Sequence, residues 1–172
     1  MSEASRLIAR ARQLGRESMG KYACAEGTLL AVADTLNMLV SDNVFKAVIG
    51  LSSMSGGCGA LCGAIAALGL RFGRTRAAYH ENSDTTQIGE WYLTLRQAVI
   101  RVRGQFVTEY GGYLCCDIQD KLFGRSYDSL DPVDLEAFMQ PQLGAREVCR
   151  QVTENAAGWT VEAILETEAA SG

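Results

Sequence analysis

The chain has 172 residues, 48% of them hydrophobic and 21% charged, which suits a globular domain with a sizeable core. Its net charge of −4 argues against nucleic acid as the main partner. The longest apolar run, residues 58–70, is shorter than the roughly 20 residues that cross a bilayer, so membrane insertion is not expected.

Residues 1–20 are expected to form an amphipathic helix. Apolar positions recur near helical spacing from Leu7 to Leu14, and arginines occupy most of the other side. The segment contains two glutamates and no apolar signal core, so we interpret it as a surface helix rather than a targeting peptide. Without a secretion signal, the expected compartment is the reducing cytoplasm, where structural disulfides are uncommon.

Two helices are expected between residues 24 and 52. Leucine, valine and alanine recur at helical spacing over residues 24–40, which predicts the first of them. Ser41 and the two residues after it then break the helix and supply an N-cap. A shorter helix over residues 44–52 follows.

The next expected helix, over residues 58–74, follows a glycine–serine loop over residues 53–57. It begins with the stretch "CGALCGAIAALG", which is almost entirely glycine, alanine and cysteine. Glycine inside a helix costs up to about 1 kcal/mol relative to alanine. Several glycines in one helix therefore indicate that another backbone, or a bulky inorganic group, comes very close to it.

A polar loop over residues 75–83 is expected to separate this helix from a longer one. Asp84 or Thr85 would cap the long helix, whose apolar residues keep a clear 3.6-residue period. The glycine pair that follows Tyr110 would end it.

Three helices are expected in the remainder of the chain. A short one begins near Cys115, and another has Pro132 in its first turn. The last covers residues 145–166. No period-two pattern indicates a strand, so the expected fold is all-α, a single-domain multi-helix bundle or orthogonal array.

Cysteine is the residue type that carries the candidate chemistry. The chain has a single histidine, His80, which lies among polar residues and is interpreted as a solvated side chain. The cysteines fall near predicted helix starts, where partial positive charge stabilises a thiolate and lowers its pKa. If several helix starts converge, the thiols would form one pocket. The candidate site residues are Cys24, Cys58, Cys62, Cys115, Cys116 and Cys149.

The order of these cysteines resembles that of a known family. The core Cys-Gly-Ala-x-x-Gly lies at residues 58–63, with "CAEGTLLAV" before it and "EYGGYLCCDI" after it. This resembles the redox-active proteins named for the pattern C…GCAxxG…C…C, over about residues 20–160. The resemblance implies a family core over residues 21–168 within one cysteine-rich domain, residues 1–172. The four cysteines that define the pattern map to Cys24, Cys58, Cys115 and Cys149.

Related domains occur in split-Soret cytochromes, where non-haem cysteines look like iron–sulfur ligands. The resemblance therefore implies an iron–sulfur cluster held by these four thiolates. It also implies electron transfer or cluster-based small-molecule chemistry, as in an oxidoreductase, and a redox partner protein. No Cys-x-x-Cys-His motif occurs, so no c-type haem is expected. Cys62 and Cys116 are additional to the pattern, and each is either a further ligand or a small packed residue.

Other interpretations stay open at this point. A thiol–disulfide protein would use Cys58 as nucleophile and Cys24, Cys62 or Cys116 to resolve it, although the chain has no Cys-x-x-Cys. A structural zinc site is a second alternative, although its ligands usually come in close sequence pairs. A third is a helical interaction module without a cofactor. The small-residue helix and the apolar faces are also compatible with a homodimer.

Overall fold

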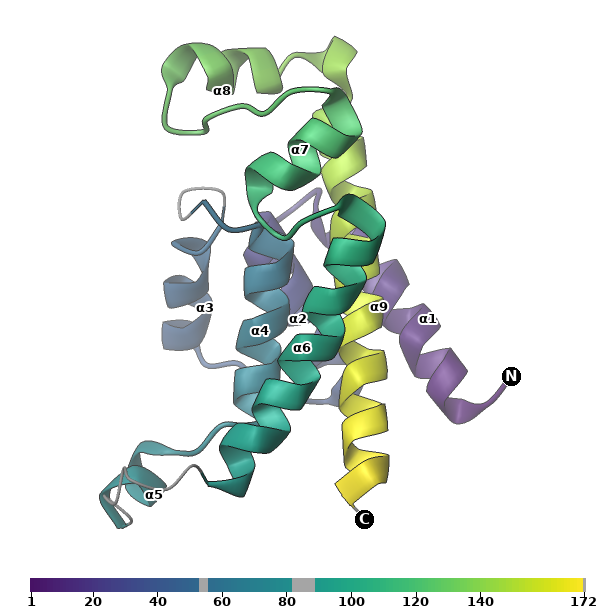
Figure 1. The fold of residues 1–172 in the computed structure, drawn as a ribbon, viewed down its shortest axis with the longest axis vertical. Helices are drawn as coiled ribbons and strands as arrows, with labels where there is room; N and C mark the ends of the chain where they lie inside the picture. Colours follow the sequence, from purple (N-terminus) through teal and green to yellow (C-terminus); the bar gives the residue numbers. More distant parts are fainter. Residues whose placement is uncertain (53–55, 82–88, 172) are drawn as a thin grey trace.

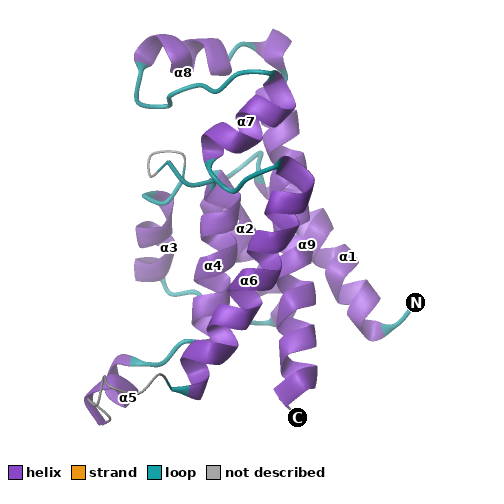
Figure 2. Cartoon of the chain, viewed as in Figure 1, coloured by secondary structure: helices purple, strands orange, loops and turns teal. Residues whose placement is uncertain are grey.

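The computed structural model describes residues 1–52, 56–81 and 89–171, and these form nine α-helices and no extended strand. Figure 1 shows their arrangement, and Figure 2 shows the helices joined only by loops and turns. The all-α fold expected from the sequence is confirmed. The helices are α1 (Glu3–Ser18), α2 (Cys24–Leu36), α3 (Asp42–Ile49), α4 (Gly59–Phe72), α5 (Arg76–Glu81), α6 (Glu90–Tyr110), α7 (Cys115–Phe123), α8 (Pro132–Phe138) and α9 (Ala145–Ser171).

Five helices, α1, α2, α4, α6 and α9, pack around the core. The most extensive contacts are those of α1 with α9 and of α2 with α4. In Figure 1, α2, α4, α6 and α9 run alongside one another, with α7 and α8 at one end and α5 at the other. The fully buried side chains between them include Leu29, Leu68, Phe106 and Ile164. No helix in the described ranges is both long and apolar enough to cross a membrane.

The small residues of α4 let it approach α2 very closely. A Cβ atom added at Gly63 would overlap the carbonyl oxygen of Ala25, and one added at Gly59 would overlap the sulfur of Cys24. The close approach expected for this helix is therefore confirmed, with α2 as its neighbour. The same approach brings the first turns of α2 and α4 together.

The N-terminal helix α1 lies against α9, as an amphipathic surface helix should. Ala11 is fully buried, and Gly15 is close enough that a Cβ atom there would lie 2.8 Å from the carbonyl oxygen of Thr153. At the edge of this contact, Arg16 forms ion pairs with Glu147 and, at 3.1 Å, with Glu154.

Expected boundaries are wrong at α2, α3, α5 and α9. The helix α3 ends at Ile49 rather than at residue 52, and α9 continues past residue 166 to Ser171. The helix predicted over residues 24–40 ends at Leu36, because Asn37 adopts a left-handed conformation with φ of 53°. The loop predicted over residues 75–83 contains α5, whose first turn is capped by the Thr75 hydroxyl accepting a hydrogen bond from the Ala78 N–H at 3.1 Å. His80 lies in this helix and is exposed.

The long helix α6 ends at Tyr110, directly before the glycine pair, as expected. Gly111 follows Tyr110 with φ of 80°, and its N–H bonds the carbonyl oxygen of Val107. The caps expected at Asp84 or Thr85 lie outside the described residues. Ser41 caps α3 and Pro132 opens α8, both as predicted.

Candidate functional site

Four cysteines, contributed by four different helices, line one small cavity. Cys24 is the first residue of α2, Cys58 is the N-cap of α4, and Cys115 is the first residue of α7. Cys149 lies in the second turn of α9. The cavity that all four line has a volume of about 40 Å³. The fold thus brings together side chains that are far apart in the sequence, and no disulfide joins cysteines in the described ranges.

Two backbone hydrogen bonds hold the starts of α4 and α7 beside each other. The N–H of Cys58 donates to the carbonyl oxygen of Tyr113 at 3.3 Å, and the N–H of Cys115 donates to that of Gly56 at 3.0 Å. Gly56 has φ of 77°, a conformation that favours glycine. The loops before the two helices are therefore paired, and this pairing fixes Cys58 relative to Cys115.

Two acidic residues fix the starts of α2 and α7 in the same way. The buried carboxylate of Glu26 accepts a hydrogen bond from the N–H of Ala23 at 3.1 Å. The carboxylate of Asp117 accepts from the N–H groups of Tyr113 and Leu114 at 3.1 and 3.0 Å. In each helix the acid lies two residues after the cysteine and bonds the backbone just before it, so the cap also positions the thiol.

The walls of the small cavity are mostly apolar. One polar side chain, Gln119, touches a thiol: its Nε2 donates to the sulfur of Cys115 at 3.4 Å, and its Oε1 accepts from the N–H of Tyr127 at 2.7 Å. Gln119 is one helical turn after Cys115, a spacing that could have identified it from the sequence. The apolar side chains of the wall are Ala60, Ile118, Leu122, Phe123 and Val152.

Burial raises the pKa of three of these thiols and so keeps them protonated at neutral pH. Desolvation, with a smaller contribution from neighbouring sulfurs, raises the pKa of Cys58 well above its ordinary value. The same causes raise the pKa of Cys149 to about 12 and that of Cys115 to about 11. The expectation that a helix start lowers the pKa of Cys58 is wrong here. Two N–H groups in the first turn of α4 do act in that direction, but desolvation outweighs them.

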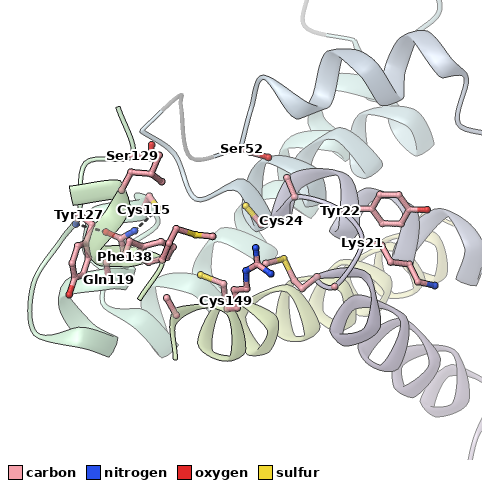
Figure 3. Close-up of a pocket in the computed structure, with 17 residues that line it drawn as sticks. Lys21, Tyr22, Cys24, Ser52, Cys115, Gln119, Tyr127, Ser129, Phe138 and Cys149 are labelled. Carbon is pink, nitrogen blue, oxygen red and sulfur yellow. Dashed lines mark hydrogen bonds between the residues drawn. The ribbon is translucent and has the colours of Figure 1, made fainter. Parts of the chain in front are cut away.

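A larger cavity of about 390 Å³ adjoins the small one. Cys24, Cys115 and Cys149 line both, whereas Cys58 lines only the small one. Figure 3 shows Cys24 and Cys149 in the middle of the larger cavity, with Cys115 and Phe138 on one side and Tyr22 on the other. The thiols are thus enclosed on the side of Cys58 and open toward a cavity on the other.

The two additional cysteines lie apart from these cavities. Neither Cys62 nor Cys116 lines the small cavity or the larger one. Cys116 is exposed and lines a separate hollow with Cys115, and Cys62 is half-buried on α4. Within the described ranges, no three His, Cys, Asp or Glu side chains lie close enough together to hold a single metal ion.

Thiols from four separate helices thus line one cavity of an all-α fold, an arrangement compatible with cysteine-based redox chemistry. A family model described as "Putative redox-active protein (C_GCAxxG_C_C)" matches residues 22–163, and the chain belongs to this family. The resemblance seen in the sequence is confirmed. No curated protein and no solved structure matches the chain.

Proposed function

We propose that this protein binds an iron–sulfur cluster and carries out electron transfer or small-molecule redox chemistry. Cys24, Cys58, Cys115 and Cys149 would be the ligands. The observation that carries the proposal is that these four thiols, from four helices, line one largely apolar cavity. A donor set made only of cysteine is the set that iron–sulfur clusters use.

The surroundings of the thiols suit an anionic cluster. Gly59 leaves free the space beside the sulfur of Cys24 that any larger residue would fill. The starts of α2, α4 and α7, each with partial positive charge, lie at the cavity that the thiols line. Gln119 donates to the sulfur of Cys115 at 3.4 Å, and hydrogen bonds to ligand sulfurs tune cluster potentials.

Three of the buried thiols, those of Cys58, Cys115 and Cys149, would ionise at neutral pH only together with a bound cation. Their raised pKa values mean that ionising them without a cation is unfavourable. The iron ions of a bound cluster would supply that positive charge, and the cluster would take or give one electron at a time. The chain itself would hold the cluster, keep water from its Cys58 side and leave the larger cavity as access for a small molecule. Electrons would be exchanged with a redox partner protein.

The alternatives have less support from the geometry. A nucleophilic cysteine needs an accessible thiol of lowered pKa. Cys58 is only 7% exposed, and burial raises its pKa. Structural zinc sites usually take ligands from close sequence pairs, whereas these four come from separate helices.

Single cysteine variants test the proposal. We expect alanine at Cys24, Cys58, Cys115 or Cys149 to remove most of the iron and sulfide from protein purified without oxygen. Cys62→Ala and Cys116→Ala are matched controls that should keep both, because neither residue lines the cavity. Circular dichroism would show that each variant is folded. Full iron content in folded Cys58→Ala protein would contradict the assignment.

A further inference from the structure

The larger cavity beside the thiols carries positive charge and no acid. The described residues that line it include Lys21 and Arg146 but no aspartate or glutamate. Neither cation forms an ion pair with a described residue. Nearby, Arg16 of α1 and Arg150 of α9 are both paired with Glu147. Arg146 lies three residues before Cys149, so the two side chains share a face of α9. The cavity is therefore suited to an anion.

The opposite wall of the cavity is apolar and aromatic. Phe138 packs against Tyr127 with ring centroids 5.6 Å apart and against Phe123 at 6.0 Å. Leu135, one helical turn before Phe138, and Met139, directly after it, line the same cavity and are exposed. A ligand held at one end by Arg146 would thus lay an apolar portion against these side chains, of which Figure 3 labels Phe138.

We propose that this cavity binds a small organic carboxylate, with its charged end at Arg146 and its apolar portion against Phe138. The bound molecule would lie directly beside Cys24, Cys115 and Cys149. The carboxylate would be a ligand of the proposed redox site. That it faces an iron–sulfur cluster rests on the proposed function. A cavity of about 390 Å³ accommodates a molecule of the size of benzoate.

Equilibrium dialysis of the cluster-loaded protein against benzoate and against benzamide tests the inference. The two probes have nearly the same shape, but only benzoate is charged. We expect benzoate to bind at least about 10-fold more tightly than benzamide, and Arg146→Gln to weaken benzoate binding by about 10-fold or more. Arg10→Gln removes the same charge from an exposed position on α1 and should leave binding unchanged.

Iron and sulfide analysis of the same samples separates the two proposals. Fully loaded protein that binds benzoate no better than benzamide would overturn the inference alone. Unchanged benzoate binding in Arg146→Gln, together with a shifted reduction potential, would also overturn it, because the arginine would then serve only the charge of the cluster. Protein without iron and sulfide would instead contradict the proposed function, whatever the dialysis shows.

Discussion

A glycine in the first turn of α4 lies against the sulfur of Cys24. A methyl group at Gly59 would overlap that sulfur, whereas one at Gly69, in the same helix, meets nothing within 4 Å. We expect Gly59→Ala to displace Cys24, to lower the iron content and to cost about 1–3 kcal/mol of stability. Gly69→Ala should keep the iron and gain up to about 1 kcal/mol. Iron analysis and urea unfolding of both variants measure these two effects. Equal iron contents in the two variants would contradict the close packing at Cys24.

The thiols also differ in their expected reactivity once metal is removed. Cys116 is exposed, so iodoacetamide should modify it first at pH 8. Because the pKa of Cys115 is raised to about 11 and that of Cys149 to about 12, their thiolate fractions are small at pH 8. Their modification rates should rise about tenfold per pH unit until the pH approaches those values. Mass spectrometry of timed samples measures this, and rapid labelling of Cys149 at pH 8 would contradict its burial.

At the scale of a helix, the carboxylate of Asp117 both caps α7 and positions Cys115. Asp117→Ala removes the bonds to the N–H groups of Tyr113 and Leu114, which should cost about 0.5–2 kcal/mol and lower the iron content. Asp131 is a matched control, because it caps α8 by accepting from two N–H groups but does not hold a cysteine. Asp131→Ala should cost a similar free energy and keep the iron. Thermal unfolding and iron analysis test both; equal iron loss would show that α7 capping has no special role.

The helices themselves could largely be predicted from local sequence signals, because caps and periodicity are local. Ser41, the glycines after Tyr110 and Pro132 each marked a boundary that the structure has. The errors arose where a signal was weak. Asn37 ends α2 by adopting a left-handed conformation, and α5 forms over a polar stretch that was expected to be a loop.

The candidate site could be predicted less completely. The cysteines and their places at helix starts follow from the sequence, but their convergence depends on long-range packing. The hydrogen bonds that pair the loop before Cys58 with the loop before Cys115, and the close contact of Gly63 with Ala25, join segments far apart in the chain. Arg146 and Ser52 carried no motif, so only the fold identifies them as lining the larger cavity.

At the scale of the whole molecule, the family match begins at residue 22, yet α1 contributes to the core. Arg12 on α1 donates to Asn155 at 2.7 Å, and Asn155 donates to the hydroxyl of buried Tyr110 at 2.9 Å. A chain that begins at residue 21 would lose this network and the packing of α1 on α9. We expect this loss to cost at least about 2–4 kcal/mol of stability. Each kcal/mol shifts the melting temperature of a chain of this length by roughly 2–4 °C, so the shortened chain should melt at least about 8 °C lower. An unchanged melting temperature in circular dichroism would mean that α1 is dispensable for the core.

The central claim, that four thiols from four helices hold an iron–sulfur cluster, is tested most directly by the composition of the purified protein. Iron, acid-labile sulfide and zinc would be measured on protein purified without oxygen, with an absorption spectrum of the same sample. We expect iron and sulfide in comparable amounts, with broad visible absorption that bleaches on oxidation. Protein that contains no metal and has six titratable thiols, or that contains zinc alone, would contradict the claim.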